Sequence, residues 1–255
     1  MKKFFLISGL FLSSICFVYS QDDAFRKFRF GLKFDPNVTW LKPNEYVESK
    51  GVKMGYNYGL MTDFFLGKNY AIATGLEVLN IGGKVSYPNF VSTVGDDTVN
   101  LKVTTTSNIK YQIVNIPFQL KMRTNEIGYM TYFAAFGLDV GIHFKDLVNL
   151  EHKPVANSSN TVNETKVNFG SRTNFFRPAI AISLGAEYNL SGNTNFVIGL
   201  KFSNGFVNTF TKKFDTYKLD NNGVVLLDAN NQPVKSDVKA NAYSNYLSLL
   251  LGIFF

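Results

Sequence analysis

Hydrophobic and polar side chains alternate along most of this chain. Between residues 28 and 35, every second side chain is Phe or Leu, and glycine or charged residues stand between them. This period of two predicts β-strands, because successive side chains of a strand point to opposite faces of a sheet. Eight segments show the alternation and none shows helical periodicity; they cover residues 28–35, 53–64, 70–78, 114–123, 130–143, 176–188, 196–203 and 243–255.

The connections between these segments alternate in length. Short turns rich in Gly, Asn and Ser are expected at residues 67–69, 124–128 and 191–194. Long loops are expected at residues 41–52, 88–107, 145–172 and 208–241. Short turns at one end and long loops at the other are the plan of an outer-membrane barrel with both termini in the periplasm. The predicted fold class is therefore all-β, an eight-stranded antiparallel up-and-down transmembrane β-barrel.

A soluble barrel of the lipocalin type would show the same alternation. Its polar face would meet water, whereas the polar face here is rich in Gly and Ala with isolated charges, which suits a crowded interior. Aromatic residues also gather near the segment ends, as in the girdles of membrane barrels: Phe28, Phe64, Tyr70, Tyr188, Phe196 and Phe255. These features favour the membrane barrel. Its strands exceed the roughly nine to eleven residues that cross a bilayer, so we expect them to extend beyond the membrane on the loop side.

The N-terminus has the pattern of a secretory signal peptide. Lys2 and Lys3 precede an apolar run, and a small residue, Ser20, ends the segment. Cys16 follows Ile15, where a lipoprotein signal has Gly or Ala, so a lipid anchor is disfavoured. We expect cleavage after Ser20, which leaves residues 21–255 as one outer-membrane barrel domain without cysteine.

Charge and hydropathy narrow the classes of partner. The net charge of +7 is scattered, and no run of Lys and Arg exceeds two residues, which gives no support to nucleic-acid binding. No apolar stretch after the signal peptide is long enough for a transmembrane helix. The chain ends on alternating apolar residues, Leu251, Ile253 and Phe255, similar to the signal read by the outer-membrane insertion machinery. That machinery and outer-membrane lipid are the expected partners, in the bacterial outer membrane.

The polar face of the predicted strands carries charges of both signs. A barrel of eight strands is just wide enough for its own side chains, so these charges predict salt bridges that plug the lumen rather than an ion path or a catalytic pair. The predicted lumen cluster consists of Arg29, Lys33, Asp63, Glu77, Lys121, Asp139, Arg177, Glu187 and Lys201.

Two other candidate sites are weaker. His143, on the inward face, and His152, in the third long loop, lack cysteine or carboxylate partners at ligand spacing, so no metal site is predicted. The segment 220–223 lacks the downstream glutamate of a calcium loop. It predicts a hairpin turn with arms at 217–219 and 224–227, followed by a second turn at 228–231. No cofactor and no catalytic residue is expected.

The fourth segment has a proline in the middle of clean alternation. Ile116, Pro117, Phe118, Leu120 and Lys121 form this motif. It resembles the hallmark strand of the PorT-like outer-membrane β-barrel family of Bacteroidetes, although Asn115 stands where that family usually has Glu and Ile113 where it has an aromatic residue. The resemblance implies an outer-membrane barrel. It also makes an envelope or secretion complex of the type IX kind the implied partner, because the name-giving member is associated with that system.

Two functions are compatible with these features. The first is a non-enzymatic structural or interaction component of the cell envelope, with a plugged lumen. The alternative is a small passive porin-like channel for ions or solutes.

Overall fold

Ten strands make up the computed structural model, which describes residues 27–44, 46–94, 97–155, 162–168, 172–211 and 214–255. The predicted signal peptide lies outside these residues. Two short strands, β2 (Glu48–Ser49) and β7 (Val162–Asn168), pair with β4 and β6. The other eight form the barrel: β1 (Phe28–Asn44), β3 (Lys53–Gly67), β4 (Tyr70–Val94), β5 (Asp97–Arg123), β6 (Met130–Pro154), β8 (Phe176–Ser191), β9 (Thr194–Gly205) and β10 (Asn241–Phe254).

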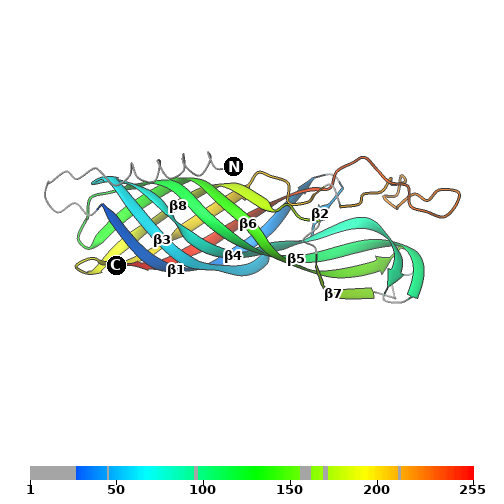
Figure 1. Cartoon of the computed structure of the whole chain (residues 1–255), viewed down its shortest axis with the longest axis horizontal. Coiled ribbons are helices and arrows are strands. Elements are labelled where there is room, and N and C mark those ends of the chain that lie inside the picture. Colours follow the sequence, from blue (N-terminus) through cyan, green and yellow to red (C-terminus); the bar gives the residue numbers. More distant parts are fainter. Residues whose placement is uncertain (1–26, 45, 95–96, 156–161, 169–171, 212–213) are drawn as a thin grey trace, which may run out of the picture.

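The eight strands close into a barrel. Each is antiparallel to the next, and β1 pairs with β10 from Gly31↔Phe254 to Asn44↔Asn241, so the first and last strands complete the ring. Figure 1 shows the start of β1 and the end of β10 at the same end of the molecule. We call this the turn end, because the short connections after β3, β5 and β8 lie there, and the opposite end the loop end. The predicted eight-stranded antiparallel barrel is confirmed.

The described residues contain no helix long and apolar enough to cross a membrane.

The two faces of the wall differ in chemistry. Outward-facing apolar side chains are exposed around the barrel and form what we call the apolar belt. Its turn-end border includes Phe28, Phe64, Tyr70, Met122, Tyr132, Tyr188 and Phe255. Its loop-end border includes Val38, Tyr56, Ile142, Phe176, Phe202 and Leu247. Inward side chains are buried, and between the borders of the belt many of them are charged.

Three strands, β4, β5 and β6, continue far past the apolar belt at the loop end (Figure 1). The expected extension of strands on this side is confirmed. The loop predicted at 88–107 is wrong, because β4 reaches Val94 and β5 begins at Asp97. The loops predicted at 41–52 and 145–172 are also shorter than expected, since β1 continues to Asn44 and β6 to Pro154. Residues 98–107 are rich in Val and Thr, which favour strands, although their polar character suggested a loop.

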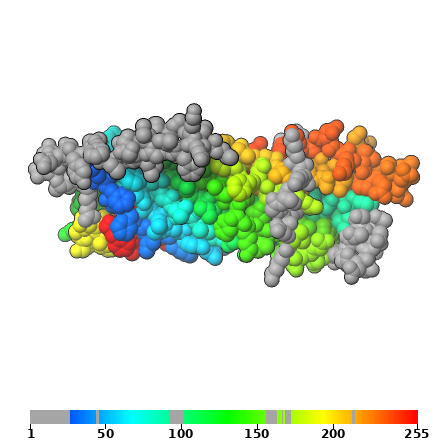
Figure 2. All heavy atoms as spheres, in the orientation of Figure 1, coloured from blue at the N-terminus to red at the C-terminus, as the bar shows by residue number. Residues whose placement is uncertain are grey.

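An apolar core fills the barrel above the charged interior. We call it the loop-end core. Inward side chains of the extended strands pack there against Phe210 and Phe214, which come from the segment between β9 and β10. Figure 2 shows this segment, in orange, at the loop end of the molecule. Its members include Leu41, Leu79, Ile81, Val85, Tyr87, Ile109, Tyr111, Ile113, Val148 and Leu150. Burial of this surface explains why the strands do not end at the border of the belt.

The segment between β9 and β10 contains the two predicted turns. Leu219 pairs with Val225 around a turn whose Gly223 has φ 74°. Asp220 accepts hydrogen bonds from the Asn222 and Val224 amides at this turn, at 2.8 and 2.9 Å. A second bridge, Leu227↔Pro233, closes the turn at Asp228. Both hairpin turns are therefore confirmed, within the fourth predicted loop.

Candidate functional site: the charged barrel interior

Five charged side chains near the turn end form what we call the turn-side layer. They are Arg29, Asp63, Lys121, Arg123 and Glu187, from β1, β3, β5 and β8. The Arg29 guanidinium lies 2.6 Å from Asp63 and 2.5 Å from Glu187. Lys121 contacts the same two carboxylates at 2.9 and 2.7 Å, and Arg123 contacts Glu187 at 2.7 Å. Arg29 and Asp63 are on neighbouring strands, whereas the other four ion pairs join strands that are not neighbours in the wall.

Aromatic rings cover the cations of the turn-side layer. Phe254, on the inward face of β10, has its ring centre 3.8 Å from the Arg29 guanidinium and 5.0 Å from the Lys121 ammonium. Phe133 lies 4.5 Å from Lys121. A cation over an aromatic face is attracted by the ring quadrupole, most strongly where water is excluded. The rings therefore fill space and stabilise the charges together.

A second set of charges, the central layer, lies further into the barrel. It consists of Lys33, Asp35, Glu77, Asp139 and Lys201. Lys33 contacts Asp35 at 3.0 Å and also pairs with Glu77. Lys201 reaches from β9 to Glu77 at 3.1 Å and to Asp139 at 2.9 Å. All five side chains are at most 7% exposed, and each carboxylate contacts a cation.

Neutral polar side chains add hydrogen bonds to the central layer. The Asn115 amide donates to Glu77 at 2.6 Å, and the Tyr246 hydroxyl donates to Asp139 at 3.2 Å. Gln119 donates to the other oxygen of Asp139 at 3.2 Å. Buried charges are stable only when such partners replace their lost hydration. The central layer is thus a connected network.

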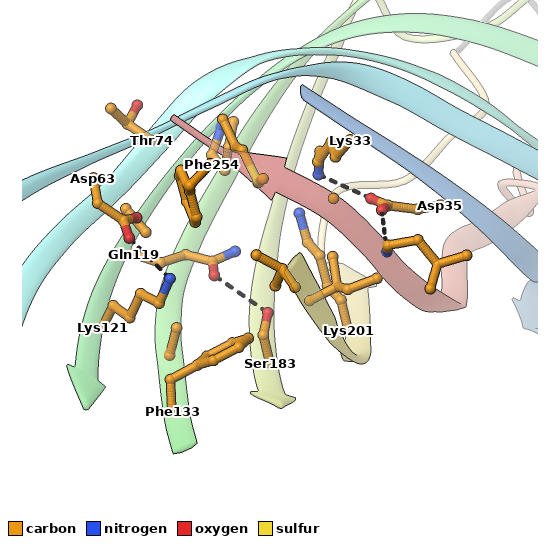
Figure 3. A pocket seen from close by; sticks show the side chains of 18 residues that line it. Lys33, Asp35, Asp63, Thr74, Gln119, Lys121, Phe133, Ser183, Lys201 and Phe254 are labelled. Atoms are coloured by element: carbon orange, nitrogen blue, oxygen red, sulfur yellow. Dashed lines mark hydrogen bonds and ion pairs between the residues drawn. The ribbon is translucent and has the colours of Figure 1, made fainter. Parts of the chain in front are cut away.

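Figure 3 shows the space between the two layers, with Asp63 and Lys121 on one side and Lys33, Asp35 and Lys201 on the other. The cavity there is only about 80 Å³. Gln119 and Ser183 are hydrogen-bonded across it at 3.3 Å. A space of this size accommodates a few water molecules at most.

All nine residues of the predicted lumen cluster point into the barrel and are buried. Eight of them join the two layers. Arg177 does not: its described partners are Ser203 and Ser244, and its guanidinium lies 5.4 Å from the Tyr246 ring centre.

The predicted cluster left out several members of this interior, among them Asp35, Arg123, Phe133, Tyr246 and Phe254. Asp35 and Arg123 stand on the polar face of their segments, so the alternation alone already places them inside the barrel. Tyr246 and Phe254 also follow from alternation, because the outward side chains of β10 have odd numbers. Their aromatic character hid them, since aromatic residues were sought on the outer face.

The residues of the proline motif and of the chain end lie in the wall. Ile116 and Phe118 are exposed on the outer face of β5, while Lys121 points inward to the turn-side layer. Ile253 and Phe255 face outward in the apolar belt, and Leu251 is half-buried beside them.

The two histidines lie near the loop end in separate surroundings. His143 is 3.3 Å from Asp146, which also accepts a hydrogen bond from Thr173. His152 is 2.8 Å from the Thr105 hydroxyl, and burial lowers the pKa of its imidazole. Within the described part of the chain, no three His, Cys, Asp or Glu residues are arranged to hold a metal ion.

Solved structures with similar folds are outer-membrane proteins of low sequence identity. Ail of Yersinia pestis, in complex with sucrose octasulfate, is 11% identical, with 90% of this chain and 100% of Ail covered and a TM-score of 0.37. OprG from Pseudomonas aeruginosa is 9% identical, with 92% of this chain and 99% of OprG covered and a TM-score of 0.40. Neisserial surface protein A is 10% identical, with 88% of this chain and 95% of that protein covered and a TM-score of 0.36.

No curated protein matches the sequence. The family model for the outer membrane protein beta-barrel domain, in contrast, matches residues 19–211. This range contains β1 to β9 and the charged side chains of both layers. In such barrels the apolar belt faces lipid, the short turns are periplasmic and the longer loops are extracellular. The chain belongs to the outer membrane protein β-barrel domain family and is located in the bacterial outer membrane.

Proposed function

We propose that this protein is a non-enzymatic component of the cell envelope, with a lumen closed by its own side chains. Its role is to dock an envelope partner at the loop end. The observation that carries the closed lumen is the pair of charged layers, whose ion pairs join strands on different sides of the bore.

Three further features support closure. The cavity between the layers is about 80 Å³. Phe254 and Phe133 pack against the turn-side cations. The loop-end core adds an apolar barrier above the central layer, and ions cross apolar constrictions poorly.

The extended loop end supports a docking role. A barrel needs only enough strand to cross the bilayer, yet β4, β5 and β6 have 25, 27 and 25 residues. Their extensions share a buried core with Phe210 and Phe214, so they pack as one unit beyond the apolar belt. The PorT-like strand around Pro117 makes a secretion complex of the type IX kind the partner class that we favour. Export with cleavage after Ser20 is part of the same proposal.

Single-channel conductance tests the closed lumen. Purified folded protein in a planar bilayer in 1 M KCl should give no stable openings. The matched control is a large-bore porin purified and reconstituted in the same way, which must show openings. Stable openings of this protein would contradict closure and support the alternative of a small passive pore.

Partner capture tests the docking role. Crosslinking in intact cells should capture the same envelope proteins repeatedly with the full chain. A variant with residues 86–106 replaced by an Asn-Gly turn removes most of the β4–β5 extension and should lose them, because the proposed contact surface is gone. Heat-modifiable migration on gels verifies that the variant barrel is folded. Equal capture by both proteins would contradict docking through this extension.

A further inference from the structure

A group of lysines gathers at the loop-end border of the apolar belt. Lys110 and Lys145 face outward from the wall, whereas Lys53 stands opposite the buried Thr39 on the inner face of its strand. A cavity of about 210 Å³ opens there, and its lining includes Lys53, Lys110 and Lys145 but no aspartate or glutamate. Lys53 begins β3, Lys110 lies in β5 and Lys145 lies in β6. Lys84 of β4 is also close, since its charge acts on Lys53. We call this site the lysine pocket.

The lysine pocket differs from the barrel interior in its lack of counter-charge. Within the described residues, none of its lysines forms an ion pair, whereas Lys33, Lys121 and Lys201 each contact two carboxylates. The Lys53 ammonium donates instead to the neutral Asn108 side chain at 2.6 Å and to the Ile109 carbonyl at 3.4 Å. Burial and repulsion from Lys110 and Lys84 lower the Lys53 pKa to about 8. An anion in the pocket would remove this repulsion.

The position of the pocket indicates where the anion comes from. Met54 and Tyr56 line the pocket and are also exposed on the outer face, at 81% and 48%. A ligand that enters the pocket therefore lies alongside the belt with its charged group at the level of the lipid headgroups. The outer leaflet of bacterial outer membranes is built from a glycolipid whose diglucosamine headgroup carries phosphates. Clustered basic side chains at a membrane surface bind such anionic headgroups.

We propose that the lysine pocket binds a headgroup phosphate of the outer-leaflet glycolipid, with Lys53, Lys110 and Lys145 as its ligands. Lysine suits this role because its ammonium is a compact charge with three donors. This inference depends on the outer-membrane location and not on the closed lumen, so either proposal can fail alone.

Lipid binding to folded protein in detergent micelles, followed by native mass spectrometry, tests the proposal. The probes are lipid A with both phosphates, lipid A with its phosphates removed, and inorganic phosphate. We expect the phosphorylated lipid to bind far more tightly than either of the others. The triple variant K53Q/K110Q/K145Q should bind it on the order of 100-fold more weakly, since one lysine near a membrane surface contributes roughly fivefold.

A matched control removes the same charge from lysines that have partners. Lys50, Lys153 and Lys235 pair with Glu48, Glu151 and Asp215 outside the apolar belt. The variant K50Q/K153Q/K235Q should bind lipid A like the unchanged chain. Equal binding of the dephosphorylated lipid, or unchanged affinity of the first triple variant, would overturn the proposal. Inorganic phosphate that binds as tightly as the lipid would show a site for free anions instead.

A second measurement needs no variant and so remains decisive if the triple variant does not fold. Acetylation of lysines in the unchanged protein, mapped by mass spectrometry, should be slowed by lipid A at Lys53, Lys110 and Lys145. Lys50 and Lys153 should react at the same rate with and without the lipid. Absence of protection at the three pocket lysines would overturn the proposal.

Discussion

Glu187 has the largest number of ionic partners in the turn-side layer. It accepts from Arg29, Lys121 and Arg123, and its side chain is fully buried. In the Glu187→Gln variant, the three cations would stay close together, and Asp63 would be the carboxylate that remains in that layer. Removal of one partner from a buried ion pair typically costs about 3–5 kcal/mol. We expect a loss of that size in the free energy of unfolding.

Denaturant unfolding in lipid vesicles, followed by the fluorescence of Trp40, measures this loss; the chain contains one tryptophan. Trp40 stacks on Phe202 with ring centres 6.2 Å apart, so its emission should report loss of the barrel. Asp215→Asn is the matched control, because Asp215 pairs with Lys235 on the exposed surface and should change stability by less than about 1 kcal/mol. Equal effects of the two substitutions would mean that water solvates the turn-side layer.

Lys53 provides a prediction about pH. Its pKa is lowered to about 8 in the fold, from 10.5 for an ordinary lysine, so the unfolded chain binds more protons between these values. Stability should therefore increase as the pH rises from about 8 to about 10.5, provided that no anion occupies the lysine pocket. Titration of the Lys53 side chain by NMR in lipid-free micelles checks the value directly. In a variant with Lys84→Gln and Lys110→Gln, the midpoint should move upward. An unchanged midpoint would show that burial alone lowers the pKa.

The last strand carries the predicted insertion signal, and its role in assembly can be separated from its role in stability. Phe255 is 45% exposed at the turn-end border of the belt, with its ring centre 6.0 Å from Phe30. The Phe255→Ala variant should therefore lose little stability once folded in vesicles, but should assemble in cells several-fold less well. Quantification of the protein in outer-membrane fractions measures assembly. Phe28→Ala, at the same border, is the control. Equal assembly defects in the two variants would contradict a specific signal at the chain end.

The strands could be predicted wherever one face is apolar and the other polar. Alternation failed as a guide at the loop end, because residues 98–107 are largely polar or β-branched and are ordered by pairing with β4 and β6. The loop-end core also depends on Phe210 and Phe214, which arrive from a distant segment and show no periodicity. In the charged interior, alternation identified which side chains point inward. It could not give the partners, because these come from strands that are far apart in the sequence.

Pro117 illustrates a local irregularity that alternation does not reveal. The β4–β5 ladder is interrupted between Thr74↔Phe118 and Glu77↔Asn115 and resumes in the same register. Gly75 stands opposite the proline with φ 153°, and a Cβ there would lie 2.1 Å from the Leu60 carbonyl oxygen. Proline lacks the amide donor that a ladder requires. The strand opposite the proline therefore requires glycine at position 75, because of its backbone conformation and its close approach to β3.

At the scale of the whole molecule, three groups of inward side chains follow one another along the bore, and we propose that each acts as a barrier. The turn-side layer and the central layer are charged, and the loop-end core is apolar. The lysine pocket opens beside this column at the border of the lipid, and Ile81 and Tyr111 of the loop-end core form part of its lining. We propose closure for the charged layers and lipid binding for the lysine pocket, so substitutions in the charged layers should leave lipid binding unchanged.

Barriers in series predict that no single one is required for closure. Replacement of residues 209–239 by a Gly-Asn turn removes Phe210 and Phe214 from the loop-end core but leaves both charged layers in place. The double variant Arg29→Ser and Glu187→Ser instead removes an ion pair of the turn-side layer and leaves the core. We expect no openings from either variant in planar bilayers in 1 M KCl, because the remaining barriers still fill the bore. Heat-modifiable migration shows that each barrel is folded. Openings in the first variant alone would make the loop-end core the gate, and openings in the second alone would make the turn-side layer the gate.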